Sequence, residues 1–245
     1  MSLTACRRCP RLVAWREEAA RNPPRRFAGQ KYWAKPVPAF GDPAGRIFIV
    51  GLAPAANGAN RTGRMFTGDE SGNFLFEALH AVGLANQPTS VERGDGLMLH
   101  GALLSAACRC APPDNRPTPG ERENCRGYLE ADLAGLASPR VLVALGATGF
   151  QACLRVLGAS GATIPKPKPH FSHGARFQIG EDALFATYHP SQQNTFTGKL
   201  TQRMLRDVLR RAVRAAGTPP HPDPFPPSGG EGRREDSLSR RERGG

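Results

Sequence analysis

Long hydrophobic runs are missing from this 245-residue chain, and so are several catalytic signatures. No apolar stretch approaches the roughly 20 residues that a membrane-spanning helix needs. The N-terminal MSLTACRRCP lacks the apolar core of a signal peptide. There is no GxSxG, no HExxH and no HxE paired with PCxxC, which argues against an esterase-type elbow, a zinc protease and a zinc nucleobase deaminase. We therefore expect a cytoplasmic protein with no membrane partner.

Negative charge is also scarce, since 33 Lys and Arg face 21 Asp and Glu, for a net charge of +12. This excess favours a polyanionic partner, nucleic acid first and an acidic membrane surface second. Part of it is local, because five arginines fall within residues 233–243. Residues 218–245 are Pro, Gly, Ser and charge with a single Phe, so we expect a disordered tail. Residues 1–217 are expected to form one domain.

Strand-like and helix-like patterns alternate along the chain. Apolar runs predict strands at Arg46–Val50, Gly101–Cys108 and Arg140–Leu145, and helical periodicity predicts helices at Ser71–Val82, Glu121–Leu136 and Ala147–Leu157. A hairpin-like pair, Arg176–Ile179 and Leu184–Tyr188, and a helix at Lys199–Ala216 follow, while Pro10 opens an N-terminal helix with Leu12, Trp15 and Ala19 on one face. The alternation predicts an α/β fold, with a mostly parallel sheet covered on both faces.

The loop Gly51–Asp69, GLAPAANGANRTGRMFTGD, joins the first predicted strand to the first long predicted helix. Glycine-rich turns at this point of an α/β fold commonly hold phosphates. This loop has neither a Walker lysine followed by Ser/Thr nor a GxGxxG. It carries Arg61, Arg64, Phe66 and Asp69 instead. That mixture favours a nucleic-acid backbone plus a base over a free nucleoside triphosphate.

Six cysteines need an explanation other than disulfides, which are rare in the cytoplasm. Cys6 and Cys9 form a CxxC, and Cys110 and Cys125 bound a Pro-rich stretch. Four thiolates hold either zinc or a [4Fe–4S] cluster, and the wide spacing of the second pair weakens zinc. Cys108 competes with Cys110, and spacing alone does not choose between them. Inert buried thiols are the remaining alternative, and the helical position of Cys153 suits a small core residue.

The segment His189–Thr197, HPSQQNTFT, directly follows an apolar strand. The carboxyl end of a sheet strand is where open α/β proteins bind ligands. A lone histidine is more often structural, but the neighbouring Ser, Gln and Asn side chains make a functional role the better interpretation of His189.

Three blocks, with CRRC at residues 6–9, together resemble the type-5 uracil-DNA glycosylases, the iron–sulfur branch of the uracil-DNA glycosylase superfamily. The blocks are GLAPAANGANRTGRMFTGDESG at 51–72, CRCAPPDNRPTPGERENC at 108–125 and HPSQQNTFTGKLT at 189–201. The resemblance spans about residues 6–215. It implies a three-layer α/β/α sandwich with a short, mostly parallel central sheet. It also implies a DNA-repair hydrolase that releases uracil, and other deaminated bases such as hypoxanthine and xanthine, leaving an abasic site. We expect a monomer that associates with the nucleoid through DNA.

The resemblance also implies a cofactor and a set of site residues. Its [4Fe–4S] ligands would be Cys6, Cys9, Cys110 and Cys125, with Cys108 a bystander and zinc the alternative metal. Phe66 would stack on the flipped base, His189 would donate to the uracil O2, Asp69 would stabilise the sugar or orient water, and Asn115 would read the base edge. Arg61, Arg64, Ser191, Gly51 and Ala53 would hold phosphates or line the pocket, and Gln192 and Asn194 would probe the minor groove or fill the gap left by the base.

Three positions depart from the family pattern. Many superfamily members carry an acid or Asn in the first loop, where this chain has the apolar Pro54–Ala56. Type-4 relatives have an Asn on the second strand, where this chain reads Leu104–Ala107, so uracil selection should be looser. Asn57 stands where histidine is expected. The apolar loop supports the runner-up function, a non-catalytic Cys-metal nucleic-acid-binding protein, whereas the intact HPS segment argues for the enzyme.

Overall fold

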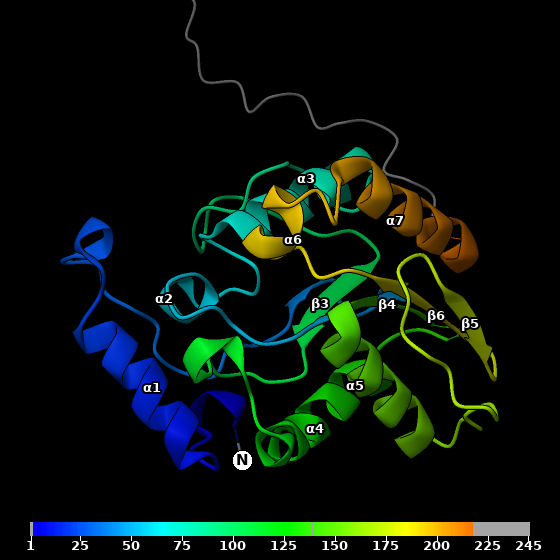
Figure 1. The fold of residues 1–245 in the computed structure, drawn as a ribbon, viewed down its shortest axis with the longest axis horizontal. Helices are drawn as coiled ribbons and strands as arrows, with labels where there is room; N and C mark the ends of the chain where they lie inside the picture. Colours follow the sequence, from blue (N-terminus) through cyan, green and yellow to red (C-terminus); the bar gives the residue numbers. More distant parts are fainter. Residues whose placement is uncertain (1, 139, 218–245) are drawn as a thin grey trace, which may run out of the picture.

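A central sheet organises the computed structural model, which describes residues 2–138 and 140–217 (Figure 1). In the described residues its six strands are ordered β1-β3-β2-β4-β6-β5. Their bounds are β1 Phe40–Gly41, β2 Ile47–Gly51, β3 Ala102–Ala106, β4 Val141–Leu145, β5 Arg176–Ile179 and β6 Asp182–Thr187. The four middle strands are parallel, and the edge strands β1 and β5 pair antiparallel with β3 and β6.

Helices cover both faces of this sheet. Their bounds are α1 Pro10–Arg21, α2 Ala59–Thr62, α3 Glu70–Ala81, α4 Pro119–Ala134, α5 Gly146–Ala159, α6 Gln192–Phe196 and α7 Gln202–Ala216, with 3-10 turns at Leu3–Ala5, Arg25–Phe27 and Pro113–Asn115. Helices α3 and α7 lie on one side of the sheet and α4 and α5 on the other, while α1 lies at one end (Figure 1).

Two hydrophobic layers follow from the alternation of side chains along the strands. Ile47 and Ile49 of β2 pack with the α3 and α7 side chains, whereas Phe48 and Val50 pack with those of α4 and α5. The strands are buried along their whole length, as expected for a parallel sheet covered twice. The predicted α/β/α sandwich is therefore confirmed.

The predicted long elements are confirmed, with bounds that shift by up to three residues. Three short elements, β1, α2 and α6, were not predicted. One face was predicted wrongly in α1, where Trp15 is 36% exposed and Arg16 is 2% exposed. The Arg16 guanidinium turns inward because it donates to the Cys110 sulfur, a contact that hydrophobic periodicity cannot reveal.

The predicted disordered tail, 218–245, lies outside the described residues. Within the part that the structure describes, no helix is both long and apolar enough to cross a bilayer.

Candidate active site

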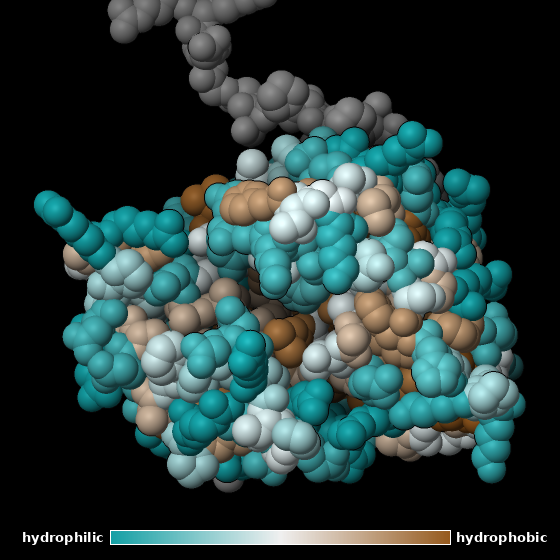
Figure 2. Space-filling model, in the orientation of Figure 1, coloured by the Kyte–Doolittle hydropathy of each residue, from teal (hydrophilic) through white to brown (hydrophobic). Residues whose placement is uncertain are grey.

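Phe66 and His189 meet where the parallel strands end. Gly51 closes β2, and the Phe66 ring lies directly over it, so that a Cβ at position 51 would stand 2.7 Å from the ring. His189 follows β6 and packs against Gly146, where a Cβ would stand 3.1 Å from the His189 Cβ. The two ring centroids are 5.8 Å apart. The face shown in Figure 2 is hollowed at its centre, with hydrophobic surface inside a hydrophilic rim.

Phe66 has a left-handed backbone, with φ of +51°, a conformation that non-glycine residues rarely adopt. Close packing on α3 holds it there: a Cβ at Gly72 would meet the Phe66 carbonyl oxygen at 2.0 Å. The side chain is only 7% exposed. The predicted stacking residue is therefore fixed in place by the start of α3, and strained residues of this kind concentrate at functional sites.

Asp69 caps α3. Its Oδ1 accepts a hydrogen bond from the Gly72 N–H at 2.9 Å, and its Oδ2 lies against Gly58, where a Cβ would approach to 1.9 Å. Burial raises the pKa of this carboxyl, while the hydrogen bonds from Gly72 and Ser71 oppose the rise. The carboxylate thus connects the end of the loop 51–69 to Gly58 in its middle, in addition to capping α3.

His189 is neutral in this setting. Burial lowers its pKa to about 4, so at neutral pH the imidazole carries one N–H. The Asn194 amide donates to the His189 carbonyl oxygen at 2.8 Å, which fixes the entry to α6. Ser191 is the residue before α6, and Gln192 is its exposed first residue. These three predicted residues therefore share one short segment with His189.

Two arginines predicted to hold phosphates are engaged inside the protein. Arg61 donates to the Asn57 and Gly68 carbonyls and to the Gln30 side chain, so its guanidinium braces the loop. Arg64 is 5% exposed and forms a two-pronged ion pair with Asp95 at 2.7 and 2.6 Å. The phosphate or pocket role of Arg64 stays a prediction, because Asp95, 31 positions away in sequence, already pairs with its guanidinium.

Asn115 and Ala53 have no hydrogen bond or ring contact with the Phe66 or His189 ring in the described chain. Asn115 is exposed in a 3-10 turn with φ of +54°. Ala53 is half-buried in the first loop. For both, the predicted pocket role stays a prediction.

Two residues of this region were missed in the sequence. Tyr32 is 7% exposed and donates to the Asn57 Oδ1 at 2.9 Å, which ties the first loop to the irregular N-terminal segment. Phe196 of α6 is 78% exposed, the most exposed of the large hydrophobic side chains described. The sequence shows that Phe196 follows the HPS segment, but it does not show that the side chain is exposed.

The four predicted metal-binding cysteines line one pocket at the N-terminal end of the molecule. Cys6, Cys9, Cys110 and Cys125 share it with Arg109 and Tyr128. All six cysteines of the described chain are free. Cys108 is fully buried and hydrogen-bonds to Cys125, whereas Cys153 is buried in the core. In the described residues, no three Cys, His, Asp or Glu side chains gather tightly enough to hold a single metal ion.

Nitrogen donors surround this pocket. Arg16 Nη1 donates to the Cys110 sulfur at 2.9 Å, and the Asn124 amide to the Cys9 sulfur at 3.4 Å. Arg109 is 1% exposed, and its Nε and Nη1 have no acceptor among the described residues, like the Arg16 Nε. Buried guanidinium N–H groups left without acceptors are costly, so the pocket is chemically incomplete as protein alone.

Comparisons with known proteins agree with the three motifs. The sequence profile of the Uracil DNA glycosylase superfamily matches residues 38–212. A type-5 uracil-DNA glycosylase from Mycobacterium tuberculosis is 51% identical over 217 residues, which cover 88% of this chain and 80% of that protein. The type-5 enzymes from Thermus thermophilus and Pyrobaculum aerophilum are 51% and 46% identical, each over 88% of this chain and over 96% and 91% of their own lengths. These matches confirm the resemblance.

Proposed function

Because the chain belongs to the uracil-DNA glycosylase superfamily, we propose that it is a DNA-repair enzyme that hydrolyses the bond between uracil and deoxyribose. The observation that supports this function most directly is the proximity of the Phe66 and His189 rings, whose centroids are 5.8 Å apart at the carboxyl edge of the sheet. An aromatic wall beside a neutral hydrogen-bond donor suits the release of a planar base. DNA is the substrate, and an abasic site is the second product.

The base must leave the helical stack before it reaches this edge. Phe66 offers it one ring face, and stacking of this kind contributes about 1–3 kcal/mol per base. Gly51 packs against this ring and Gly72 against the Phe66 carbonyl oxygen, so both glycines restrict its position. The exposed Phe196 on α6 is the residue that we expect to fill the gap left in the duplex.

His189 acts on the leaving group. As the glycosidic bond breaks, negative charge develops on the uracil O2, and a fixed donor aimed at that charge is usually the largest catalytic contribution. Neutral imidazole donates its N–H without giving up the proton. The low pKa of His189, due to burial, keeps it in this form throughout the neutral range.

Asp69 is the candidate for the sugar side of the reaction. The deoxyribose becomes cation-like as the base departs, so a nearby carboxylate can stabilise it or orient the attacking water. Its position as the cap of α3 supports a fixed carboxylate, and the first loop supplies no acid of its own. Asn115, Gly51, Ala53, Ser191, Gln192 and Asn194 complete the proposed base and backbone contacts.

A broader substrate range, including hypoxanthine and xanthine, is part of the proposal. The end of β3 offers no amide to read the base, and its one hydroxyl is engaged elsewhere, because Ser105 donates to Asp132 of α4 at 2.9 Å. A site without that selective contact discriminates less sharply between bases.

We propose a [4Fe–4S] cluster rather than zinc for the cysteine pocket. Zinc draws four sulfurs to about 2.3 Å from one centre, a tight group that these side chains do not form. A cubane instead spreads its four thiolates over four irons. The unpartnered N–H groups of Arg16 and Arg109 would find acceptors in the cluster sulfides. Held by Cys6, Cys9, Cys110 and Cys125, the cluster would serve as a structural crosslink.

A glycosylase assay tests the proposed enzyme. Purified protein is incubated with duplexes that carry uracil, hypoxanthine or xanthine, and alkali then cleaves any abasic sites. We expect strand cleavage at uracil, and a rate lower by about 10²–10³-fold for His189→Ala. His80→Ala, a histidine on α3, is the matched control. No cleavage of any of the three bases by cluster-containing protein would favour the non-catalytic DNA-binding alternative, which has no turnover to lose.

A further inference from the structure

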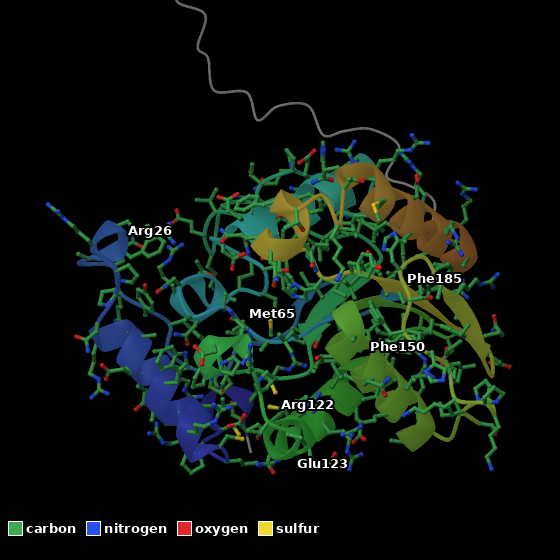
Figure 3. All side chains as sticks on the ribbon, viewed as in Figure 1. Arg26, Met65, Arg122, Glu123, Phe150 and Phe185 are labelled. Atoms are coloured by element: carbon green, nitrogen blue, oxygen red, sulfur yellow. The ribbon has the colours of Figure 1, made fainter. Side chains whose placement is uncertain are left out.

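A second hollow opens on the same edge of the molecule, between α4 and α5. Its volume is about 140 Å³. Three arginines and one carboxylate line it: Arg122, Glu123 and Arg126 from α4 and Arg155 from α5, with Thr148 and Ala107 beside them. Figure 3 marks Arg122 and Glu123 on α4, on the side of the central hollow opposite α6.

The charge of this hollow is only partly compensated within the protein. Arg126 pairs with Glu123 at 2.7 Å and with Glu130, and Arg155 reaches Glu123 at 3.7 Å. The Arg122 side chain makes no hydrogen bond or ion pair in the described chain, and its Nε is buried without an acceptor. Among the three arginines, the Arg122 guanidinium is thus the one without a carboxylate partner in the described chain, and a guanidinium matches the oxygens of a phosphate.

The cavity borders the proposed active site directly. The Ala107 N–H donates to the carbonyl of Gly51 at 3.0 Å, the residue that lies behind the Phe66 ring. Thr148 is two residues beyond Gly146, against which His189 packs. A DNA strand whose flipped nucleotide enters at Phe66 and His189 would continue along this edge, and its next phosphates would pass close to the arginines.

We propose that this arginine cavity binds one backbone phosphate of the damaged strand, next to the flipped nucleotide. The inference rests on the proposed function, because that function brings the strand to this edge. The contact fixes the register of the strand and takes no part in bond cleavage. Phosphate contacts of this kind position a duplex without reading its sequence.

Binding measurements on Arg122→Gln and Arg155→Gln test the inference. The probe is a fluorescent duplex with a stable abasic analogue, titrated by anisotropy at several salt concentrations. We expect Arg122→Gln to raise Kd about 5–10-fold and to reduce the salt-dependence slope by about 0.9, the change for one lost phosphate contact. Arg210→Gln, which removes one charge from α7, is the matched control. Equal effects at 122 and 210 would overturn the proposal.

A neutral methylphosphonate, placed at one linkage at a time on either side of the analogue, locates the contact. We expect one linkage to weaken wild-type binding and to have no further effect in Arg122→Gln. If every linkage weakens both proteins alike, the cavity holds no DNA phosphate. If inorganic phosphate raises the Tm of wild type but not of Arg122→Gln, and DNA affinity is the same for both, the site serves free phosphate and the proposal fails.

Two further readouts keep the outcome clear. In single-turnover cleavage, Arg122→Gln should need about 5–10-fold more enzyme than wild type to reach half of the maximal rate, in line with its higher Kd. If Arg122→Gln fails to fold, the same binding measurements are made on Arg155→Gln, because the Arg155 side chain is more exposed. A wild-type protein without glycosylase activity would contradict the proposed function. The anisotropy and methylphosphonate measurements would still show whether the cavity binds a DNA phosphate.

Discussion

Burial keeps the His189 imidazole uncharged at neutral pH, and the lowered pKa sets the pH range in which it acts as proposed. An ordinary histidine would change protonation near pH 6.5. With its pKa lowered to about 4, His189 stays a neutral donor at every pH above that value. The same burial disfavours the folded protein in acid, because the unfolded histidine takes up its proton first as pH falls from about 6.5.

The pH–rate profile should reflect this neutral state. We expect single-turnover uracil release to be flat between about pH 5.5 and 8, without a step near the ordinary histidine pKa. NMR titration of the His189 ring should place its protonation near pH 4. A rate that rises or falls through pH 6.5 with the His189 titration would contradict the neutral-donor mechanism.

Two substitutions separate the structural and chemical roles of Asp69. Asp69→Asn keeps a side-chain oxygen for the Gly72 N–H, so we expect little loss of stability, but it removes the charge. Asp69→Ala also loses the cap, which costs about 1 kcal/mol. Thermal unfolding and single-turnover rates of both variants give the answer. A stable Asp69→Asn with wild-type turnover would reduce Asp69 to a helix cap.

At the level of single residues, the sequence predicted which side chains lie together when each follows directly from a strand or loop motif. This applies to Phe66 with His189 and to the four cysteines, whose roles stay predictions. It could not predict partners from distant segments. Arg64 was predicted to hold phosphates or line the pocket, because no residue near it in sequence indicates its ion pair with Asp95.

At the scale of elements, the loop 51–69 is held by a second loop. Asp95 accepts hydrogen bonds from the backbone N–H groups of Val91, Glu92 and Leu97 while it pairs with Arg64. Burial alone would raise the pKa of Asp95, but the hydrogen bonds from the Arg64 guanidinium and from these backbone groups outweigh it and lower the pKa to about 2. The ion pair is therefore the link that fixes one loop to the other.

Breaking this link should cost stability while leaving DNA affinity unchanged. Arg64→Met strands a largely buried carboxylate, so we expect a loss of about 3 kcal/mol at pH 7. Because the pKa of Asp95 is depressed, its contribution is complete above about pH 4 and disappears as pH falls towards 2. Chemical unfolding of wild type and Arg64→Met at pH 7 and near pH 2 measures this difference in stability. A weaker Kd for DNA with unchanged stability would restore the predicted phosphate contact.

Long elements were predictable because their periodicity is repeated several times. The three missed elements are short: β1 has two residues, α2 four and α6 five. Each forms because of its neighbours, as β1 does by pairing with β3, and so few residues carry no period of their own.

At the scale of the whole molecule, several contacts connect the N-terminal segment to the rest of the protein, among them the Asn60 amide that donates to the Arg16 carbonyl. Besides the cysteine pocket, Arg11 of α1 forms a two-pronged ion pair with Glu121 of α4 at 2.8 Å. Glu121 also completes the capping box of α4 with Thr118. Removal of a cluster should therefore loosen this end without detaching α1.

Chelation of the cluster tests this arrangement. Purified protein should be brown, with broad absorbance near about 400 nm that disappears with the iron. We expect the apoprotein and Cys110→Ser to lose several degrees of Tm, and proteolysis to cut first before residue 10. Cys153→Ser, a core thiol, should keep its colour. Colourless protein with stoichiometric zinc would contradict the iron–sulfur assignment.

The glycine behind Phe66 has a consequence for substrate breadth. Because the Gly51 backbone lies against one face of the Phe66 ring, the ring cannot move away from an incoming base. The Phe66 side of the base-binding site is therefore rigid. Any tolerance for a purine must come from the other side, where a single amide hydrogen bond from Asn194 ties His189 to α6. We expect the width of the base-binding site, and hence base preference, to follow an exchange of residues 189–198 between relatives. An exchange of the loop 51–69 should leave it unchanged.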